Sequence, residues 1–437
     1  MVTLDAGPPN ASSISDIQDL VRQAARERPP GAWILGRGYH EFDLAEKRHP
    51  TRWDLDIASP VHPVKIAHRS GHTHVLNSLA LKRVGISMET GDPPDGLIDR
   101  DLATGEPTGL VHGMNELLAR FLAATQDSQA ETGIRMAGAS LAALGITSIH
   151  DASSRNDWSR RDLFRTWQQR GHLPQRTSMV LGWEAFQGDA ADEGDSADDG
   201  HVRVAGVKII VHETTGRLSP SQLELNDMVL RIHQAGQQAV LHAIDEKQVT
   251  AACIAIEHAL KTSPRADHRH RIEHCSVCPP ALAKQMASAG ITVVTQPAFV
   301  YYDGGRYLRT VPSEELEHLY PVATLKQHGV RVAGSSDFPV VPPNPLVGIY
   351  AAVTRRAADG EHVLSKERIG PLEALSLFTV DAAHAIRAET GTGSIRPGTP
   401  ADLVLLSGDP TGVPEEEIKD IRVDMTMIDG QVVWERA

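Results

Sequence analysis

The sequence contains only three cysteines among 437 residues, at Cys253, Cys275 and Cys278. They are too few and too clustered for a disulfide framework, which favours a reducing compartment. Residues 1–9 show neither the basic start nor the apolar stretch of a secretory signal. No apolar run reaches the roughly eighteen residues that a membrane span needs. We therefore expect a cytoplasmic protein with no membrane segment.

The chain also lacks an excess of positive charge. Its 43 Lys and Arg residues are outnumbered by 56 Asp and Glu residues, for a net charge of −13. This balance argues against nucleic acid as a partner, because nucleic-acid binding relies on basic patches that neutralise phosphates. With 41% hydrophobic and 23% charged residues, the composition is that of an ordinary globular protein. Histidine is abundant, at 21 residues, and the positions of these histidines become informative.

From Gly145 onward, short β-branched runs alternate with polar loops and amphipathic helical stretches. Units of about thirty residues are typical of strand-plus-helix repeats, which form parallel sheets. The predicted strands are 145–150, 176–181, 206–211, 238–242, 270–274, 291–295 and 330–334. One further strand would close an eight-stranded (β/α)₈ TIM-like barrel. A doubly wound open sheet would also alternate in this way, but no glycine-rich phosphate loop supports it.

Two regions interrupt this alternation. Residues 32–118 are rich in Pro, Gly and short apolar runs, which predicts an inserted substructure within a barrel spanning 1–390. The tail 391–437 predicts antiparallel strands of a small β-sandwich, with a hairpin at Asp429-Gly430. The acidic segment 188–199 predicts a solvated loop.

Four predicted strands carry a basic or metal-binding residue at or near their carboxyl ends: Lys208, His242, His274 and Asp337. Strand ends of a barrel meet at one shared mouth, so these side chains are expected to converge. Two imidazoles and a carboxylate are an established ligand set for catalytic zinc. Bound zinc lowers the pKa of water to about 7, and Asp337 would then transfer protons as general base and acid.

The motifs that hold these residues resemble the amidohydrolase superfamily. They are VLHAIDE at 240–246, RIEHC at 271–275, GSSDFPV at 334–340 and GSIRPGTPADLVLL at 393–406. Further motifs resemble its amidohydrolase 3, or YtcJ-like, branch: WILGRGY, PVKIAHRSGHTHVLNSLAL, IDRDLATGEPTGL and GITSIHDAS. The resemblance covers nearly the whole chain. It implies a (β/α)₈ barrel with a small β-sandwich built from both chain ends, divalent metal, and hydrolysis of amide-like bonds.

The resemblance also assigns roles to individual residues. His242 and His274 match the ligands of the fifth and sixth strands, and Asp337 matches the aspartate of the eighth. Lys208 matches the fourth-strand lysine, which many members carboxylate to bridge two metal ions. The alternative is that Lys208 simply pairs with a barrel carboxylate.

This chain departs from the family pattern in two places. The family's first strand ends in a His-x-His pair, and the sequence here starts after that point. Three explanations stay open: the start is misplaced, the chain is a fragment, or the protein works without these two ligands. His212-Glu213 stands where the family usually has Asp-Gly. His72-Thr73-His74 could replace the missing pair, because residues two apart in a strand share a face. The surrounding motif instead implies a substrate-side role for the first of these histidines.

His72, Asn77, Tyr301 and Phe338 are therefore predicted to contact substrate, with helix capping as the alternative for the first two and rim packing for the aromatics. Cys275 and Cys278 have zinc-type spacing without a second pair, which favours structural thiols.

The predicted protein is an amidohydrolase that uses one or two divalent ions to cleave a carbon–nitrogen bond of a small molecule. Zinc is the metal expected first among the candidates. A catalytically impaired barrel and a ring deaminase remain alternatives. A homodimer is possible.

Overall fold

The computed structural model describes residues 3–93, 96–121, 127–187, 201–214 and 217–436. The predicted acidic loop 188–199 lies outside these ranges. The chain forms two compact units, residues 1–130 and 131–437. None of the described helices is both long enough and apolar enough to cross a membrane.

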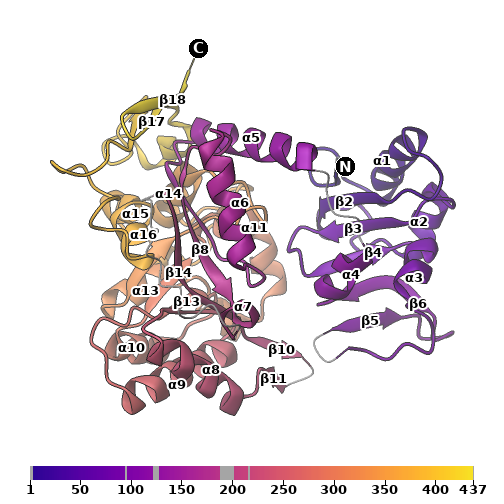
Figure 1. Ribbon diagram of the computed structural model, residues 1–437, viewed down its shortest axis with the longest axis horizontal. Coiled ribbons are helices and arrows are strands. Elements are labelled where there is room, and N and C mark those ends of the chain that lie inside the picture. The colour runs from indigo at the N-terminus through magenta and orange to yellow at the C-terminus, as the bar shows by residue number, and fades with distance from the viewer. Residues whose placement is uncertain (1–2, 94–95, 122–126, 188–200, 215–216, 437) are drawn as a thin grey trace. The chain divides into compact units, whose positions relative to one another are not determined.

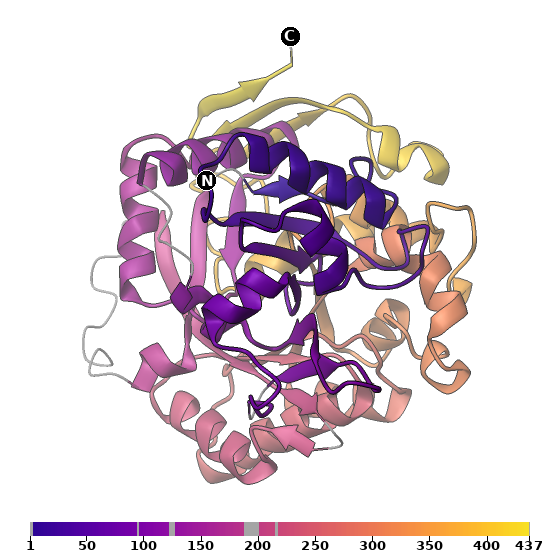
Figure 2. The same cartoon turned by 90° about the vertical axis from the view of Figure 1, so that its right-hand side faces the viewer.

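The second unit is built on a curved sheet of seven parallel strands (Figures 1 and 2). The order across the sheet is β15-β14-β13-β12-β9-β8-β7. The strands are β7 (Ser148–Asp151), β8 (Arg176–Gly182), β9 (Val202–Ile210), β12 (Ala239–Ala243), β13 (Arg271–His274), β14 (Thr292–Thr295) and β15 (Arg331–Gly334). All seven predicted strands are present, and the prediction of a β/α barrel fold is confirmed.

Helices separate most of these strands along the chain, and their apolar faces form the core with the sheet. Figure 1 shows α8, α9 and α10 side by side along it. The helices of this unit are α5 (Asp127–Ala143, which begins in the first unit), α6 (Trp158–Gln169), α7 (Trp183–Gln187), α8 (Gln222–Gln234), α9 (Glu246–Thr262), α10 (Pro280–Ala289), α11 (Pro297–Thr310), α12 (Ser313–Leu316), α13 (Val322–Gln327), α14 (Pro345–Thr354), α15 (Pro371–Leu377) and α16 (Val380–Ala385). The layer between the sheet and these helices is almost continuously apolar, as expected for a parallel sheet covered by helices.

Two smaller sheets complete this unit. Strand β10 (His212–Thr214) pairs in antiparallel fashion with β11 (Arg217–Ser219). Near the C-terminus, β16 (Leu403–Leu406), β17 (Val423–Ile428) and β18 (Gln431–Glu435) form an antiparallel sheet. The predicted hairpin at Asp429-Gly430 is confirmed, because these two residues connect β17 to β18. The β-sandwich and the division at residue 390 stay predictions.

The first unit has its own six-stranded mixed sheet and its own cores. Its elements are β1 (Leu4–Asp5), α1 (Ile14–Arg26), β2 (Ile34–Tyr39), α2 (Arg52–Ala58), β3 (Val64–His68), β4 (Thr73–Leu76), α3 (Ser78–Val84), β5 (Leu97–Arg100), β6 (Pro107–His112) and α4 (Asn115–Phe121). Strand β1 pairs in parallel with β2, so the first residues share a sheet with the region from residue 32 onward.

Candidate active site

Strand register places Lys208 and His242 on the same face of the parallel sheet. Lys208 of β9 lies opposite Val240 of β12, and His242 follows two residues later. Residues two apart in a strand point to the same side, as do directly paired neighbours. Glu273 of β13 is paired with His242, so it faces the same side. Since the alternate residue Leu241 belongs to the helix-covered core, Lys208, His242 and Glu273 face the interior of the curved sheet.

His274 reaches this group because the backbone departs from regular strand geometry at that residue. Strict alternation would direct His274 to the side of Ile272, which packs in the apolar core. Instead its φ angle is +74°, in the left-handed region that non-glycine residues rarely occupy. The His274 ring lies edge-on to the His242 ring, with centroids 4.5 Å apart. Such unfavourable backbone conformations concentrate at functional sites.

Asp337 follows β15 and also has a left-handed backbone, with φ +52°. Its side chain is accessible to water, yet surrounding protein atoms raise its pKa, while the charges of His274 and Lys208 act in the opposite direction. Burial lowers the pKa of His274, which favours the neutral imidazole that binds metals. The electrostatic interactions join Asp337 to both His274 and Lys208.

Lys208 is only 4% exposed. Burial lowers the pKa of its amine, and the negative charge of Glu273 partly offsets this effect. Burial raises the pKa of Glu273, but the charges of Arg271 and Lys208 outweigh it and bring the value to about 2. Glu273 is therefore the ionised carboxylate that faces the buried lysine.

A hydrogen-bonded chain orients the His274 ring. Its Nδ1 lies 2.9 Å from Oε1 of Gln296, which accepts only, so Nδ1 carries the proton and Nε2 keeps its lone pair. The Gln296 amide in turn donates to the hydroxyl of Ser335 over 3.0 Å. Metal-binding histidines commonly show this arrangement, in which the second nitrogen is fixed by an outer partner.

Arg271 is a buried residue that connects Glu273 to His150 beneath the candidate site. It is 1% exposed and donates to Glu273 over 2.8 Å. Its other end lies 2.5 Å from Nε2 of His150, whose Nδ1 is 2.7 Å from the Ser178 hydroxyl. Because arginine can only donate, His150 accepts through Nε2 and donates through Nδ1. His150 thus has a structural partner on each side.

Three residues of this site, Arg271, Glu273 and Gln296, were not among the sequence-based candidates. Arg271 and Glu273 could have been found, because charges two apart in a short strand mark a polar inward face. Gln296 gave no such signal, since its role depends on the distance between two strand ends.

The predicted substrate-contacting residues are distributed over both units. In the second unit, Phe338 is 54% exposed beside Asp337, whereas half-buried Tyr301 packs edge-on against Tyr302 and Tyr350. In the first unit, His72 is exposed just before β4.

Asn77 is fully buried. Its side chain accepts from Val64 and Ala80 and donates to two backbone carbonyls, which fits the helix-capping alternative. His72 and His74 were considered as a replacement for the family's histidine pair. In the structure, Nε2 of His74 contacts the side-chain oxygen of Asn115.

The cysteines have no disulfide and are all buried in the apolar core of the second unit. Burial raises the pKa of the Cys253 thiol to about 12, so it stays protonated. These observations favour structural thiols.

A cavity of about 470 Å³ elsewhere in this unit is lined by Lys326, Arg331 and Arg368 among others. Arg331 begins β15, whereas Asp337 follows its end, and catalytic residues of barrels lie at the carboxyl ends of strands. The cations also have acidic partners nearby. We therefore assign the active site to the strand ends and not to this cavity.

Comparison with known proteins places this geometry in a family. Residues 1–434 match the family model described as the amidohydrolase family. The N-substituted formamide deformylase of Arthrobacter pascens is 27% identical over 467 aligned residues, covering 99% of this chain and 85% of that protein. The putative amidohydrolase YtcJ of Bacillus subtilis is 27% identical over 449 residues, covering 96% of this chain and 84% of YtcJ.

Solved structures agree with the fold. An uncharacterised metal-dependent hydrolase of Pyrococcus horikoshii superposes with a TM-score of 0.69 at 21% identity, over 95% of this chain and 83% of that one. A similar hydrolase of Pyrococcus furiosus gives 0.66 at 23% identity, over 94% and 83%. Because the family model spans almost every residue and YtcJ aligns along nearly the whole chain, this protein belongs to the YtcJ-like branch of the amidohydrolase family, as predicted, and is a hydrolase of carbon–nitrogen bonds.

Proposed function

We propose that this enzyme hydrolyses the carbon–nitrogen bond of a small, non-peptide amide with the help of a divalent metal ion. Zinc is the first candidate for this ion. The observation that carries the proposal is the pair of imidazoles of His242 and His274, with ring centroids 4.5 Å apart. Lys208 and Asp337 interact electrostatically with His274. The donor set suits such an ion, because it combines imidazole with carboxylate and His274 directs a lone pair away from Gln296.

The ion would be held by His242, His274 and Asp337, with Lys208 as a further ligand if its amine is carboxylated. Burial that lowers the lysine pKa supports carboxylation, since the neutral amine is the form that reacts with carbon dioxide. When bound, a divalent ion supplies Lewis-acid chemistry and lowers the pKa of water. The alternative, in which Lys208 only pairs with Glu273, needs no modification.

Asp337 is the proposed catalytic base and acid. It is accessible to water and interacts electrostatically with His274, so it can accept a proton from the attacking water and deliver it to the leaving nitrogen. The exposed ring of Phe338 beside it would contact substrate, and Tyr301 would support the rim. His72 remains a proposed substrate contact from the first unit.

N-substituted formamides are the substrate class that we propose to test first, because the deformylase of Arthrobacter pascens aligns along 99% of this chain. Hydrolysis would consume one water and release formate and a free amine. We further propose that the enzyme works in the cytoplasm, since its three thiols are unpaired.

The test combines metal content with product analysis. Wild-type protein supplied with zinc is expected to release amine from at least one amide of a panel that includes N-alkyl and N-aryl formamides. The double variant His242→Ala, His274→Ala should bind less metal than wild type and lose activity, and Asp337→Asn should lower kcat by about 10²–10⁴-fold. Asp359→Asn, an exposed carboxylate on another loop, serves as control. Equal metal in wild type and double variant would reject the proposal.

The same panel separates the two alternatives. A ring deaminase would release ammonia from aminated heterocycles and leave the formamides intact. A catalytically impaired barrel would turn over none of the compounds.

A further inference from the structure

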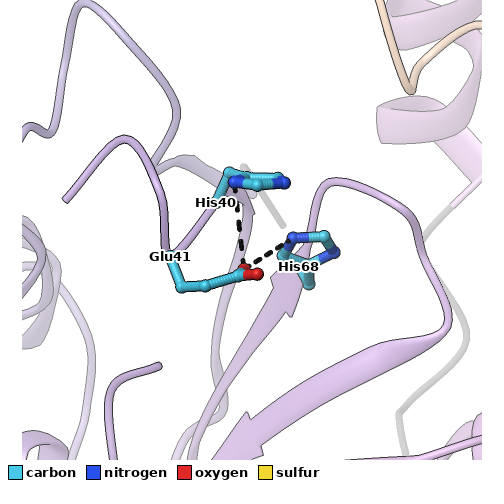
Figure 3. A group of neighbouring side chains, drawn as sticks. All are labelled: His40, Glu41 and His68. Atoms are coloured by element: carbon cyan, nitrogen blue, oxygen red, sulfur yellow. Dashed lines mark ion pairs between the residues drawn. The ribbon is translucent and has the colours of Figure 1, made fainter. Parts of the chain in front are cut away.

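The first unit holds a second group of potential metal ligands, His40, Glu41 and His68, which the proposed hydrolysis does not use (Figure 3). Strands β2 and β3 run in parallel, and Tyr39 at the end of β2 is paired with His68 at the end of β3. His40 and Glu41 follow Tyr39 directly. The strand ends therefore bring two imidazoles and one carboxylate together.

The spacing of the donor atoms matches a metal site. Oε2 of Glu41 lies 3.1 Å from Nε2 of His68 and 3.9 Å from Nδ1 of His40. One donor atom from each of the three residues falls within 4.8 Å of the others. Ligands that bind zinc at about 2.0–2.2 Å in tetrahedral geometry lie about 3.4 Å apart. The two measured distances fall on either side of that value, so small rotations of the side chains would complete the site.

The atoms that face each other are also incompletely satisfied. Oε2 of Glu41 and Nε2 of His68 are both shielded from water, and the 3.1 Å contact between them falls short of good hydrogen-bond geometry. Buried polar atoms of this kind are uncommon and point to a bound ion or a shared proton. The side chains of Glu41 and His68 are only 19% and 12% exposed, so water does not readily supply the missing hydrogen bonds.

The outer partners can orient both rings for binding. The Ser70 hydroxyl lies 2.8 Å from Nδ1 of His68, and if Nδ1 donates to it, Nε2 presents a lone pair to Glu41. The Ser70 N–H, 3.1 Å from the same nitrogen, favours the other tautomer, so metal would select between the two. Nδ1 of His40 accepts a long hydrogen bond of 3.2 Å from the Phe42 N–H, so this nitrogen carries a lone pair, and a metal bound there would replace that hydrogen bond.

A fourth side chain, His49, completes the surroundings but is not counted as a ligand. Its Nδ1 lies 3.7 Å from Oε2 of Glu41, and the same nitrogen is 3.0 Å from the Tyr39 hydroxyl. His49 is not part of the group whose donor atoms all lie within 4.8 Å of one another.

We propose that His40, Glu41 and His68 form a second divalent-metal site that takes a zinc-type transition-metal ion. Two imidazoles and one carboxylate are suited to zinc and its neighbours in the first transition series rather than to magnesium or calcium, which prefer oxygen ligands. Three protein ligands leave one coordination position open. The competing explanation is that a shared proton, and no metal, neutralises the carboxylate.

The experiment measures zinc in protein whose proposed barrel ligands have been removed. His242→Ala, His274→Ala protein, loaded with zinc and desalted, is expected to keep one zinc per chain. Adding Glu41→Gln and His68→Asn should abolish this binding, or weaken it by more than the 10–100-fold that even outer-partner mutations cost. Two added controls, Glu106→Gln and His62→Asn, remove a carboxylate and a buried imidazole of the same unit outside the group, and should keep the zinc.

A second measurement does not depend on any variant folding. Wild-type crystals soaked in zinc should give an anomalous difference peak between Glu41 and His68. No peak there at saturating zinc, or equal zinc content with and without Glu41 and His68, would overturn the proposal in favour of the shared proton. Since turnover depends on the other site, this result and that of the amide panel are independent.

Discussion

At the scale of single residues, the candidate active site depends on side chains that were not predicted as ligands. Gln296 fixes the proton of His274 on Nδ1 and is itself held by Ser335. Arg271 donates the hydrogen bond that holds the buried carboxylate of Glu273. Breaking such a buried pair typically costs about 3–5 kcal/mol, so Arg271 supports the site through stability.

Replacing Gln296 tests whether the orientation of His274 matters. In Gln296→Ala the ring loses its acceptor, so the tautomer with Nδ1 unprotonated becomes available and Nε2 is less often free to bind. We expect zinc affinity at the barrel site to fall about 10–100-fold. Competition with a chromophoric chelator measures this, in the Glu41→Gln, His68→Asn background so that only one proposed site contributes.

The matched control is Gln285→Ala, which removes a glutamine bonded to Glu257 on the surface of the same unit. Its zinc affinity should equal that of the parent protein. An unchanged affinity in Gln296→Ala would show that the hydrogen bond does not position His274 for metal.

The residue scale also shows where sequence reasoning stops. Lys208 and His242 could be assigned to one face, because strand alternation is a local rule. The same rule places His274 on the wrong face, and only the left-handed φ of +74° brings it to His242. The convergence was therefore predicted from the shared mouth of a barrel and from the family resemblance, and not from strand periodicity.

At the scale of elements, the strands of the barrel were predictable and the N-terminal region was not. Each parallel strand is a short β-branched run, often preceded by a glycine that ends a helix, as Gly290 does for α10 with φ +67°. In the first unit, β1 is only two residues long and pairs with β2, more than thirty positions away. No local pattern encodes such a pairing.

Helix α8 offers a test of the local signals that define an element. Ser221 caps it, accepting from the Glu224 N–H, while Glu224 accepts from the Ser221 N–H over 2.9 Å. Ser221→Ala should lower the free energy of unfolding by about 1 kcal/mol, because the first turn loses an acceptor. Urea denaturation followed by circular dichroism would measure the change.

Ser288→Ala is the control for this substitution. Its hydroxyl donates to the Lys284 carbonyl within α10 and caps no helix start, so its removal should change stability by less than about 0.5 kcal/mol. If Ser221→Ala were equally neutral, the start of α8 would be fixed by tertiary packing alone.

At the scale of the whole molecule, the two units have separate apolar cores, and all three cysteines belong to the core of the second. The thiols are therefore natural reporters for that unit. Cys275 directly follows His274, so opening of this core would disturb the proposed barrel ligands, whereas His40, Glu41 and His68 lie in the other unit.

Thiol labelling therefore tests which of the two proposed sites binds the zinc ion that stabilises the core of the second unit. In native protein at pH 8, a disulfide reagent should label none of the three thiols quickly, because they are buried and Cys253 has its pKa raised to about 12. Zinc at 100-fold above its dissociation constant should slow labelling a further 100-fold or so, since opening must first release the ion. This protection should vanish in His242→Ala, His274→Ala protein and persist in Glu41→Gln, His68→Asn protein. The opposite pattern would mean that the ion protecting the barrel core is bound by the first unit.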